Sequence, residues 1–425
     1  MSLEQQQELE STYVMHTFAR KPVELVSGQG MEVVDATGKT YLDFLSGIGV
    51  ISLGHCNPVL VEALQKQTAK LLHVSNYYYV EGRGELAKTL SDLLNVRVAE
   101  DTQTPWESFF ANSGAEANEC AIKLARLYAK TRVYERAIAE GADEEAARAA
   151  MQSAPQVIVT LDKSFHGRTL ATLAATAQPG KQEAFQPLPA GFISTPANNV
   201  AALRELFETR GDEICAVMVE CIQGESGVHP CTAQFLAEIR RLTQERDALF
   251  MCDEVQCGIY RCGTYPFGFQ HFEVVPDVVT MAKGIGSGFP MGVCAARQAV
   301  ARVFEPGDHG TTFGGSCLAI TAGRTVLDYI ATHDLATHVH DVGVYMRSQL
   351  AQLPGVVEVR GLGLMIGAEL ADGMSAPDVV AAGLDAGLLL NAPGPRTLRF
   401  LPPLICTKAD VDELVARLKT ILSAE

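Results

Sequence analysis

The chain has 425 residues, of which 47% are hydrophobic and 20% are charged, a balance typical of a globular protein with two or three domains. Its formal net charge is −16 and it has no basic run, which argues against binding to nucleic acid or to an anionic membrane. No apolar run reaches 18 residues, and the polar first ten residues resemble neither a signal peptide nor a transit peptide. The eleven cysteines lack paired metal-ligand spacing, so we expect reduced thiols in a cytoplasmic protein and no metal site.

The first expected elements are a hairpin and a helix. Residues 30–44 contain two β-like runs on either side of a turn with Gly38. Pro58 is well placed to begin a helix over residues 59–72, where apolar residues recur at helical spacing. The loop 75–79, Ser-Asn-Tyr-Tyr-Tyr, is aromatic, and its side chains serve either packing or the wall of a pocket.

A short strand over residues 106–111 leads into a turn of small residues, Asn-Ser-Gly-Ala-Glu-Ala-Asn-Glu, and then a helix over 117–129. Backbone N–H groups and the positive end of the helix dipole meet at such a turn and suit a phosphate. The alternative is a capped helix without a ligand, because Ser113 and Glu116 have the spacing of a capping box. Residues 128–154 are rich in Ala, Glu and Arg and predict a solvated helical insertion.

Further apolar runs alternate with helical segments such as 232–248. The runs cover residues 157–161, 214–220, 249–253 and 278–283. This alternation predicts an α/β protein with a large, mostly parallel sheet. Polar residues recur where the runs end, and the carboxyl ends of parallel strands are where ligands bind.

Two of these runs end in Asp253 and Lys283, and glycines follow both. An acid and an amine facing one crevice are what a pyridoxal phosphate enzyme needs. The lysine bonds covalently to the cofactor, and the carboxylate keeps the pyridine nitrogen protonated. A structural ion pair at two strand ends is the alternative.

The C-terminal part changes character after a long helix that begins near Leu318. Residues 355–370 and 388–404 carry β-like runs, and residues 408–422 form an amphipathic helix. We expect a smaller α+β domain that the N-terminal hairpin joins in space. The predicted division is 1–60 for the N-terminal part of the small domain, 61–315 for the large cofactor-binding domain and 316–425 for the C-terminal small domain.

Six short motifs extend this interpretation to nearly the whole chain. They are Ser113-Gly-Ala-Glu-Ala-Asn-Glu, Ser164-Phe-His-Gly-Arg, Val219-Glu-Cys-Ile-Gln-Gly-Glu, Asp253-Glu-Val-Gln, Ala282-Lys-Gly and Gly310-Thr-Thr-Phe-Gly-Gly. In this order they resemble the class III aminotransferases, which are pyridoxal phosphate enzymes of fold-type I. The resemblance implies a homodimer with shared active sites and, in the nearest members, transfer of the terminal amino group of an acylated ornithine to a 2-oxo acid.

The resemblance also implies cofactor-binding roles. Lys283 would hold the cofactor and shuttle a proton, Asp253 would pair with the pyridinium nitrogen, and Phe165 would stack on the ring. Gln256 would hydrogen-bond the phenolic oxygen, and Glu254 and Val255 complete that motif. The phosphate would be held by the N–H groups of Gly114 and Ala115 and, from the second subunit, by Thr312.

Four residues would bind the substrates. Arg168 would hold the substrate carboxylate bidentately, as the guanidinium fork allows, and Thr311 would lie beside the acylated end. Arg399 would pair with Glu225 while the amine substrate is bound and would be freed for the carboxylate of glutamate. A surface ion pair is the alternative for these two residues.

Other readings remain open. The amino donor of the same scaffold could equally be ornithine, succinylornithine, succinyl-diaminopimelate, 4-aminobutyrate or an acylated lysine. Gly284-Ile-Gly-Ser-Gly288 suggests a dinucleotide-binding dehydrogenase, but Phe289 occupies the last glycine position of that motif and no acidic ribose partner follows. Ser316-Cys317 and Cys221 depart from the family pattern, which has Asn-Pro and Pro at these positions, and the insertion is longer than usual.

Overall fold

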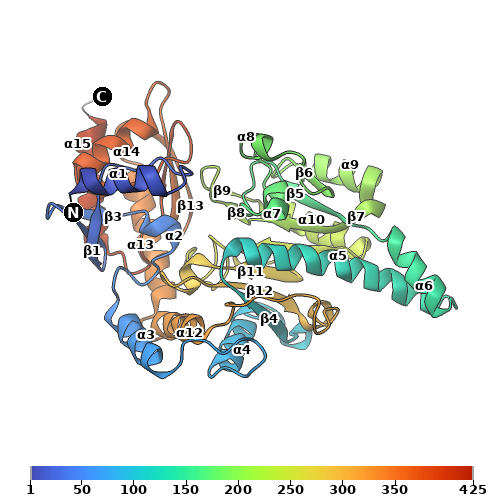
Figure 1. Ribbon diagram of the computed structural model, residues 1–425. Coiled ribbons are helices and arrows are strands. Elements are labelled where there is room, and N and C mark those ends of the chain that lie inside the picture. Colours follow the sequence, from blue (N-terminus) through green and yellow to red (C-terminus); the bar gives the residue numbers. More distant parts are fainter. Residues whose placement is uncertain (1, 424–425) are drawn as a thin grey trace.

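A seven-stranded sheet forms the centre of the larger lobe in this computed structural model, which describes residues 2–423 (Figure 1). In sheet order its strands are β4 (Trp106–Ala111), β12 (Gly292–Arg297), β11 (Val278–Met281), β10 (Leu249–Asp253), β7 (Ile214–Val219), β5 (Val157–Leu161) and β6 (Phe192–Thr195). The run from β11 to β6 is parallel, and β12 is antiparallel to both of its neighbours. The predicted α/β fold with a mixed, mostly parallel sheet is therefore confirmed.

The strands are continuous apolar runs because helices cover the sheet on both faces. Every residue of β5, β7, β10 and β11 is buried. The covering helices include α5 (Gly114–Ala139), α7 (Leu170–Ala175), α9 (Val200–Arg210) and α10 (Ala233–Glu245). Three predicted strands have the observed limits, whereas β7 and β11 end one and two residues earlier than expected. The chain turns away after Met281, and Lys283 has a φ of +47° in the short 3₁₀ helix Lys283–Ile285.

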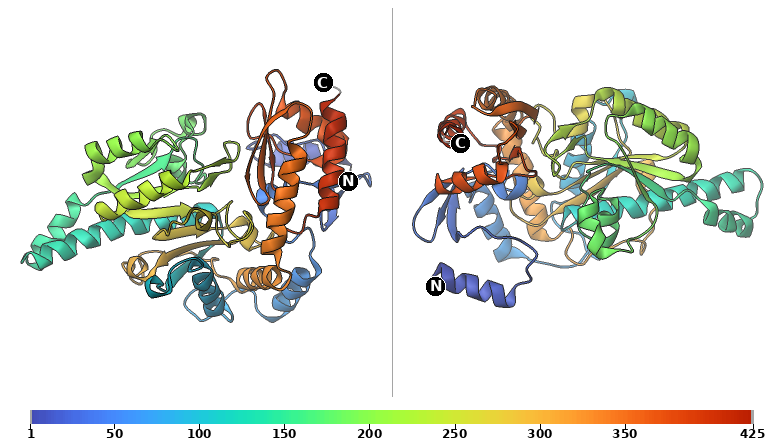
Figure 2. Two further views of the ribbon diagram at one scale, coloured as in Figure 1. Left: turned by 180° about the vertical axis from the view of Figure 1, so that it is seen from behind. Right: turned by 90° about the horizontal axis from the view of Figure 1, so that it is seen from above.

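The predicted limits of the helix over 117–129 were wrong at both ends. Helix α5 begins at Gly114, where the Ser113 side chain accepts a hydrogen bond from the N–H of Glu116, and it continues to Ala139. The sequence from 128 onward has high helix propensity and no glycine before Gly141, so nothing stops the helix sooner. The insertion is thus the end of α5 plus a returning helix, α6 (Glu144–Ala150), and the two project from the lobe as an arm (Figures 1 and 2).

The smaller lobe combines both ends of the chain. One sheet contains β1 (Leu25–Gln29), β2 (Glu32–Asp35), β3 (Thr40–Asp43) and β15 (Leu388–Leu389), and another contains β13 (Val356–Leu362), β14 (Met365–Leu370) and β16 (Thr397–Phe400). The helices α13 (Leu335–Leu350), α14 (Ala376–Asp385) and α15 (Lys408–Leu422) pack with them. Because β15 pairs in parallel with β3, the N-terminal hairpin and the C-terminal segment share a sheet, as expected. The proposed division into domains stays a prediction.

Three helices lie where the two lobes meet, at the bottom of Figure 1: α3 (Pro58–Lys70), α4 (Arg83–Leu94) and α12 (Cys317–Thr332). Helix α12 begins with an N-cap at Ser316, whose hydroxyl accepts a hydrogen bond from Ala319 N. The departure from the family pattern at this position therefore preserves the start of the helix. Cys221, the second departure, lies in the core with its Sγ 3.8 Å from that of Cys252.

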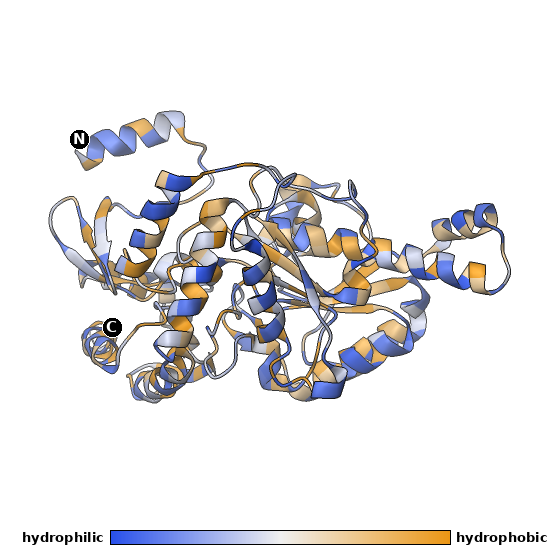
Figure 3. Cartoon of the chain, turned by 90° about the horizontal axis from the view of Figure 1, so that it is seen from below, coloured by the Kyte–Doolittle hydropathy of each residue, from blue (hydrophilic) through white to orange (hydrophobic). Residues whose placement is uncertain are grey.

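The remaining helices are short or peripheral. They are α1 (Leu3–Tyr13), α2 (Ser46–Gly49), α8 (Pro179–Gln182) and α11 (Gln298–Ala301). Helix α1 has no buried residue and stands apart from the body of the molecule (Figure 3). Across residues 2–423, none of the helices combines the length and apolar character needed to cross a membrane.

Candidate active site

A cavity of about 460 Å³ opens beside the carboxyl ends of β7, β10 and β11. Nine of the predicted site residues line it: Gly114, Ala115, Phe165, Arg168, Glu225, Asp253, Val255, Gln256 and Lys283. Four further polar residues that the sequence analysis did not single out also line it: Asn112, Asn118, His166 and Glu220. The strand ends thus gather most of the predicted residues around one space, as the parallel sheet topology requires.

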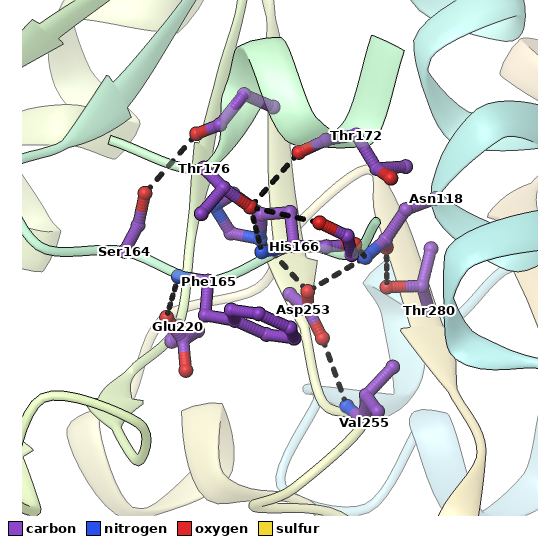
Figure 4. Close-up of polar contacts among 12 residues, drawn as sticks. Asn118, Ser164, Phe165, His166, Thr172, Thr176, Glu220, Asp253, Val255 and Thr280 are labelled. Atoms are coloured by element: carbon purple, nitrogen blue, oxygen red, sulfur yellow. Dashed lines mark hydrogen bonds and ion pairs between the residues drawn. The ribbon is translucent and has the colours of Figure 1, made fainter. Parts of the chain in front are cut away.

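Asp253 is held from several sides at the floor of this cavity (Figure 4). Its Oδ2 atom accepts hydrogen bonds from His166 Nδ1 and from Asn118 Nδ2, both at 2.8 Å, and its Oδ1 accepts one from Val255 N at 3.0 Å. Asn118 is itself oriented by Thr280, whose hydroxyl donates to Asn118 Oδ1 at 2.6 Å. The carboxylate is only 3% exposed, so these contacts replace the water that a buried charge loses.

The imidazole of His166 lies in the electrostatic field of two carboxylates, Asp253 and Glu220. Burial alone would lower the pKa of His166, but the hydrogen bond to Asp253 and the carboxylates of Asp253 and Glu220 raise it above the usual value. Its Nε2 atom is buried and has no hydrogen-bond partner among the described residues. Both His166 and Asn118 belong to motifs quoted from the sequence. Asn118 could have been singled out because it is a polar residue on an otherwise apolar, buried helix face.

Glu220 connects two loops at the cavity. Its Oε1 atom accepts a hydrogen bond from Phe165 N at 2.9 Å, and its Oε2 accepts one from Gly224 N at 3.2 Å. Burial raises the pKa of Glu220 to about 7. The loop that carries Phe165 and Arg168 is therefore tied to the loop that carries Glu225.

Lys283 extends into the cavity from the 3₁₀ helix that follows β11. Burial lowers the pKa of its amine below the usual value, and the charge of Arg399 acts in the same direction against the opposing charges of Glu225 and Asp253. No hydrogen bond to the Lys283 amine is found among residues 2–423. A lysine that is held near carboxylates but is not bonded to them is free to react as a nucleophile.

A buried ion pair joins the two lobes beside Lys283. Arg399, on β16 and 2% exposed, donates from Nη1 to Glu225 Oε1 at 2.7 Å, to Gly224 O at 3.0 Å and to Gln256 Oε1 at 3.3 Å. Gln256 also donates from Nε2 to Glu225 Oε1 at 3.2 Å. Burial alone would raise the pKa of Glu225, but the charges of Arg399 and Lys283 lower it. Arg399 is buried and the side chain of Glu225 is only 23% exposed, so the interpretation as a surface ion pair was wrong.

The turn before α5 offers free backbone donors at one end of the cavity. Among the described residues, the N–H groups of Gly114 and Ala115 have no protein acceptor, as is usual in the first turn of a helix. A Cβ atom at Gly114 would lie 2.8 Å from the side chain of Val255, so only glycine fits against the strand end. Glu116 does not complete a capping box, because its carboxylate accepts from Asn112 N instead. The turn can therefore hold an anion next to Lys283.

Four predicted residues do not line the cavity of their own chain, and one of them, Arg399, reaches it only through Glu225 and Gln256. Glu254 turns its carboxylate away to accept hydrogen bonds from Gly268 N at 2.7 Å and Phe269 N at 2.8 Å. Thr311 and Thr312 lie in a separate surface cavity of about 1100 Å³ with the aromatic loop 75–79. Thr311 still contacts the wall of the first cavity, because Asn112 Nδ2 donates to its hydroxyl at 3.1 Å.

The geometry defines a class of enzyme: a buried amine and a buried carboxylate at the strand ends of a mostly parallel sheet, with an anion-binding turn beside them. The family model of the class-III aminotransferases matches residues 15–422, and the chain belongs to this family. Because the chain belongs to this family, Gly284–Gly288 is not the dinucleotide-binding motif of a dehydrogenase.

Individual relatives agree with this assignment. The chain is 43% identical over 418 residues to the acetylornithine aminotransferase of Caldanaerobacter subterraneus subsp. tengcongensis, which covers 97% of this chain and 98% of the relative. Among solved structures, the N-acetylornithine aminotransferase of Stenotrophomonas maltophilia is 34% identical with a TM-score of 0.76, covering 98% of each chain. An ornithine aminotransferase from Toxoplasma gondii, solved with partial occupancy of PLP, is 27% identical with a TM-score of 0.87, covering 100% of this chain and 94% of that one.

The buried carboxyl of Glu254 makes the stability of the protein depend on pH. Burial raises its pKa from 4.5 to about 8, despite the two backbone N–H donors. Because the folded state holds the Glu254 proton more tightly than the unfolded state, the contribution of Glu254 to the free energy of unfolding is complete below pH 4.5. This contribution is lost as the pH rises through 8. We predict that Glu254→Gln, which cannot ionise, loses less stability than the wild type between pH 5 and pH 8 on denaturant unfolding. The exposed Glu205→Gln should keep the wild-type slope, and equal slopes in all three proteins would contradict the prediction.

Proposed function

We propose that the chain is a pyridoxal phosphate-dependent aminotransferase that moves the terminal amino group of N2-acetyl-L-ornithine to 2-oxoglutarate. The products are N-acetylglutamate 5-semialdehyde and L-glutamate, a step of arginine biosynthesis. The observation that carries the proposal is the buried Glu225–Arg399 pair beside Lys283, because an enzyme that alternates an amine substrate with a dicarboxylate needs a removable counter-charge. The names of relatives about 40% identical support acetylornithine as the amino donor.

The residues around the cavity fit the cofactor. Lys283 would bond to it, Asp253 would pair with its ring nitrogen, Phe165 would stack on the ring and Gln256 would hydrogen-bond its phenolic oxygen. The open N–H groups of Gly114 and Ala115, the buried and oriented Asp253, and the unbonded amine of Lys283 support this fit. Pyridoxal phosphate, when bound, supplies the electrophilic carbonyl and the electron-withdrawing ring that amino-group transfer requires.

The side chains of this protein then divide the remaining work. Lys283 Nζ, whose lowered pKa favours the neutral amine, takes the proton from the substrate carbon that bears the amino group and later returns a proton. Arg168 binds the far carboxylate of the substrate with its guanidinium, which lies 5.7 Å from the Phe165 ring. Glu225 neutralises Arg399 while an uncharged stretch of acetylornithine lies beside it, and moves aside when glutamate or 2-oxoglutarate brings a carboxylate.

We also propose a homodimer in which each subunit contributes Thr312 to the phosphate end of its neighbour's cavity and Thr311 to the acyl end. The position of both threonines away from their own cavity supports this arrangement. So does the apolar surface around them, since Phe313 is 66% exposed and Tyr77 is 94% exposed. Large exposed aromatic side chains in one patch are typical of a surface that a partner covers. We place the dimer in the cytoplasm, where its eleven unbonded cysteines would stay reduced.

The proposal is tested by a panel of amino donors with 2-oxoglutarate: N-acetylornithine, ornithine, succinylornithine, succinyl-diaminopimelate, 4-aminobutyrate and an acetylated lysine. We expect the highest kcat/KM for N-acetylornithine. Lys283→Ala should abolish turnover without unfolding the protein, and borohydride reduction followed by peptide mapping should label Lys283 in the wild type. A better donor in the panel would overturn the substrate assignment, and label on another lysine would overturn the catalytic one.

The proposed homodimer leads to a prediction about Thr312. Thr312→Val removes a hydroxyl that should reach the partner's phosphate site, so the variant should release the cofactor more readily during dialysis while its sedimentation stays that of a dimer. The exposed Thr420→Val should behave as the wild type. A wild-type protein that is a fully active monomer in sedimentation would contradict the shared site.

The pairing of Glu225 with Arg399 predicts opposite effects in the two half-reactions. Glu225→Ala leaves Arg399 without its counter-charge and should favour glutamate over N-acetylornithine. Arg399→Ala should do the reverse, weakening the glutamate half-reaction by ~2–5 kcal/mol, as when one partner of a buried charge pair is truncated. Single-turnover kinetics on each half-reaction separates these effects, which steady-state constants combine. If Glu225→Ala changes both halves equally, the pair is structural.

A further inference from the structure

The guanidinium of Arg399 is held at two places by two different parts of the molecule. Its Nε atom donates to Asn391 Oδ1 at 3.0 Å, and its backbone N–H donates to Asn391 O at 2.8 Å. Its Nη1 atom donates to Gly224 O, Glu225 and Gln256, all of which follow strands of the large sheet. Asn391 therefore holds a different atom of the guanidinium from the one that Glu225 holds.

The Asn391 contact is independent of the Glu225 loop. Strand β16 pairs with β14 along one edge, and along its other edge Arg399 forms an isolated bridge with Asn391. Asn391 follows β15, which is fixed to β3 in the smaller lobe. Both the backbone of Arg399 and the acceptor of its Nε thus belong to the same lobe. If Glu225 moves away, the Nε–Asn391 hydrogen bond can remain and the guanidinium keeps its orientation.

The chemistry of Asn391 matters as much as its position. Within residues 2–423, Glu225 provides the sole ion pair of Arg399, whereas Asn391, Gln256 and the Gly224 carbonyl are neutral acceptors. A neutral acceptor orients a guanidinium without cancelling its charge. A carboxylate at the same place would neutralise Arg399 permanently, because charges interact strongly in a site that is only 2% exposed.

We propose that Asn391 is a positioning residue that fixes Arg399 for the dicarboxylate substrate and leaves its charge available when Glu225 withdraws. The role rests on the proposed alternation of an amine substrate with 2-oxoglutarate. It concerns one half-reaction: the substrate carboxylate that replaces Glu225 needs both the orientation and the charge of Arg399. The amine substrate, which is bound while Glu225 neutralises Arg399, needs neither.

Two variants of the holoenzyme separate orientation from charge. Asn391→Leu removes the acceptor and retains the charge of Arg399, whereas Asn391→Asp retains the acceptor and neutralises the charge. In single-turnover titrations of the amino-loaded enzyme, each should raise the dissociation constant for 2-oxoglutarate by about tenfold or more, the size expected when a hydrogen bond to a charged group is lost. In the other half-reaction, the constants for N-acetylornithine should stay within about twofold of the wild type, on the scale of changes that leave no contact broken.

The matched control is Asn199→Asp, which makes the same charge change at the exposed N-cap of α9, where aspartate caps equally well. It should leave both half-reactions unchanged. Equal losses in both halves for Asn391→Leu and Asn391→Asp, or an unchanged 2-oxoglutarate half, would overturn the proposal. If the wild type accepts 2-oxoglutarate but not N-acetylornithine, the proposed donor fails, while the Asn391 variants still test the positioning role with the donor that does react. Cofactor absorbance and thermal unfolding check that each variant is folded and loaded.

Discussion

The parallel pairing of β5, β7, β10 and β11 is the constraint on which the rest of the site depends. Parallel strands end at the same edge, so residues that follow four separate apolar runs are brought to one space although they are far apart in the chain. Asp253 ends β10, Glu220 follows β7 directly, and Lys283 lies two residues beyond β11. The apolar residues of the strands form the core, and the reactive side chains lie within the first few residues after each strand ends.

Burying several charges at one edge creates a second constraint, because each needs a partner or must become neutral. Asp253 accepts hydrogen bonds from His166 and Asn118, and its carboxylate raises the pKa of His166. Lys283 obtains no hydrogen-bond partner that the described residues provide, and burial lowers the pKa of its amine. The same burial thus fixes the carboxylate in place and makes the amine reactive, which is the division of roles that an aminotransferase requires.

The contact between the lobes places the charged residues that we propose to distinguish the two substrates. Arg399 comes from the C-terminal sheet, while the atoms that neutralise or contact its Nη1 come from loops of the large sheet. These loops are themselves closely packed, since a Cβ atom at Gly224 would lie 1.8 Å from Gln256 Oε1. A small movement of the smaller lobe would displace Arg399 and alter the charge environment of the cavity, while Lys283 and Asp253 stay in place on the large sheet.

Much of this protein was determined by its sequence. The apolar runs before Asp253 and Lys283 predicted the α/β class and the strand ends, and the limits of β4, β5, β10 and α15 were found to the residue. Local patterns suffice there because buried strands and amphipathic helices leave their periodicity in the sequence. The end of α5 was missed because high helix propensity continues without a boundary signal until Gly141. Only the tertiary structure turned Glu254 away from the cavity, brought His166 and Asn118 onto Asp253, and set Asn391 against Arg399. Those contacts join residues between 8 and 135 positions apart, and no local pattern encodes which buried polar groups will meet.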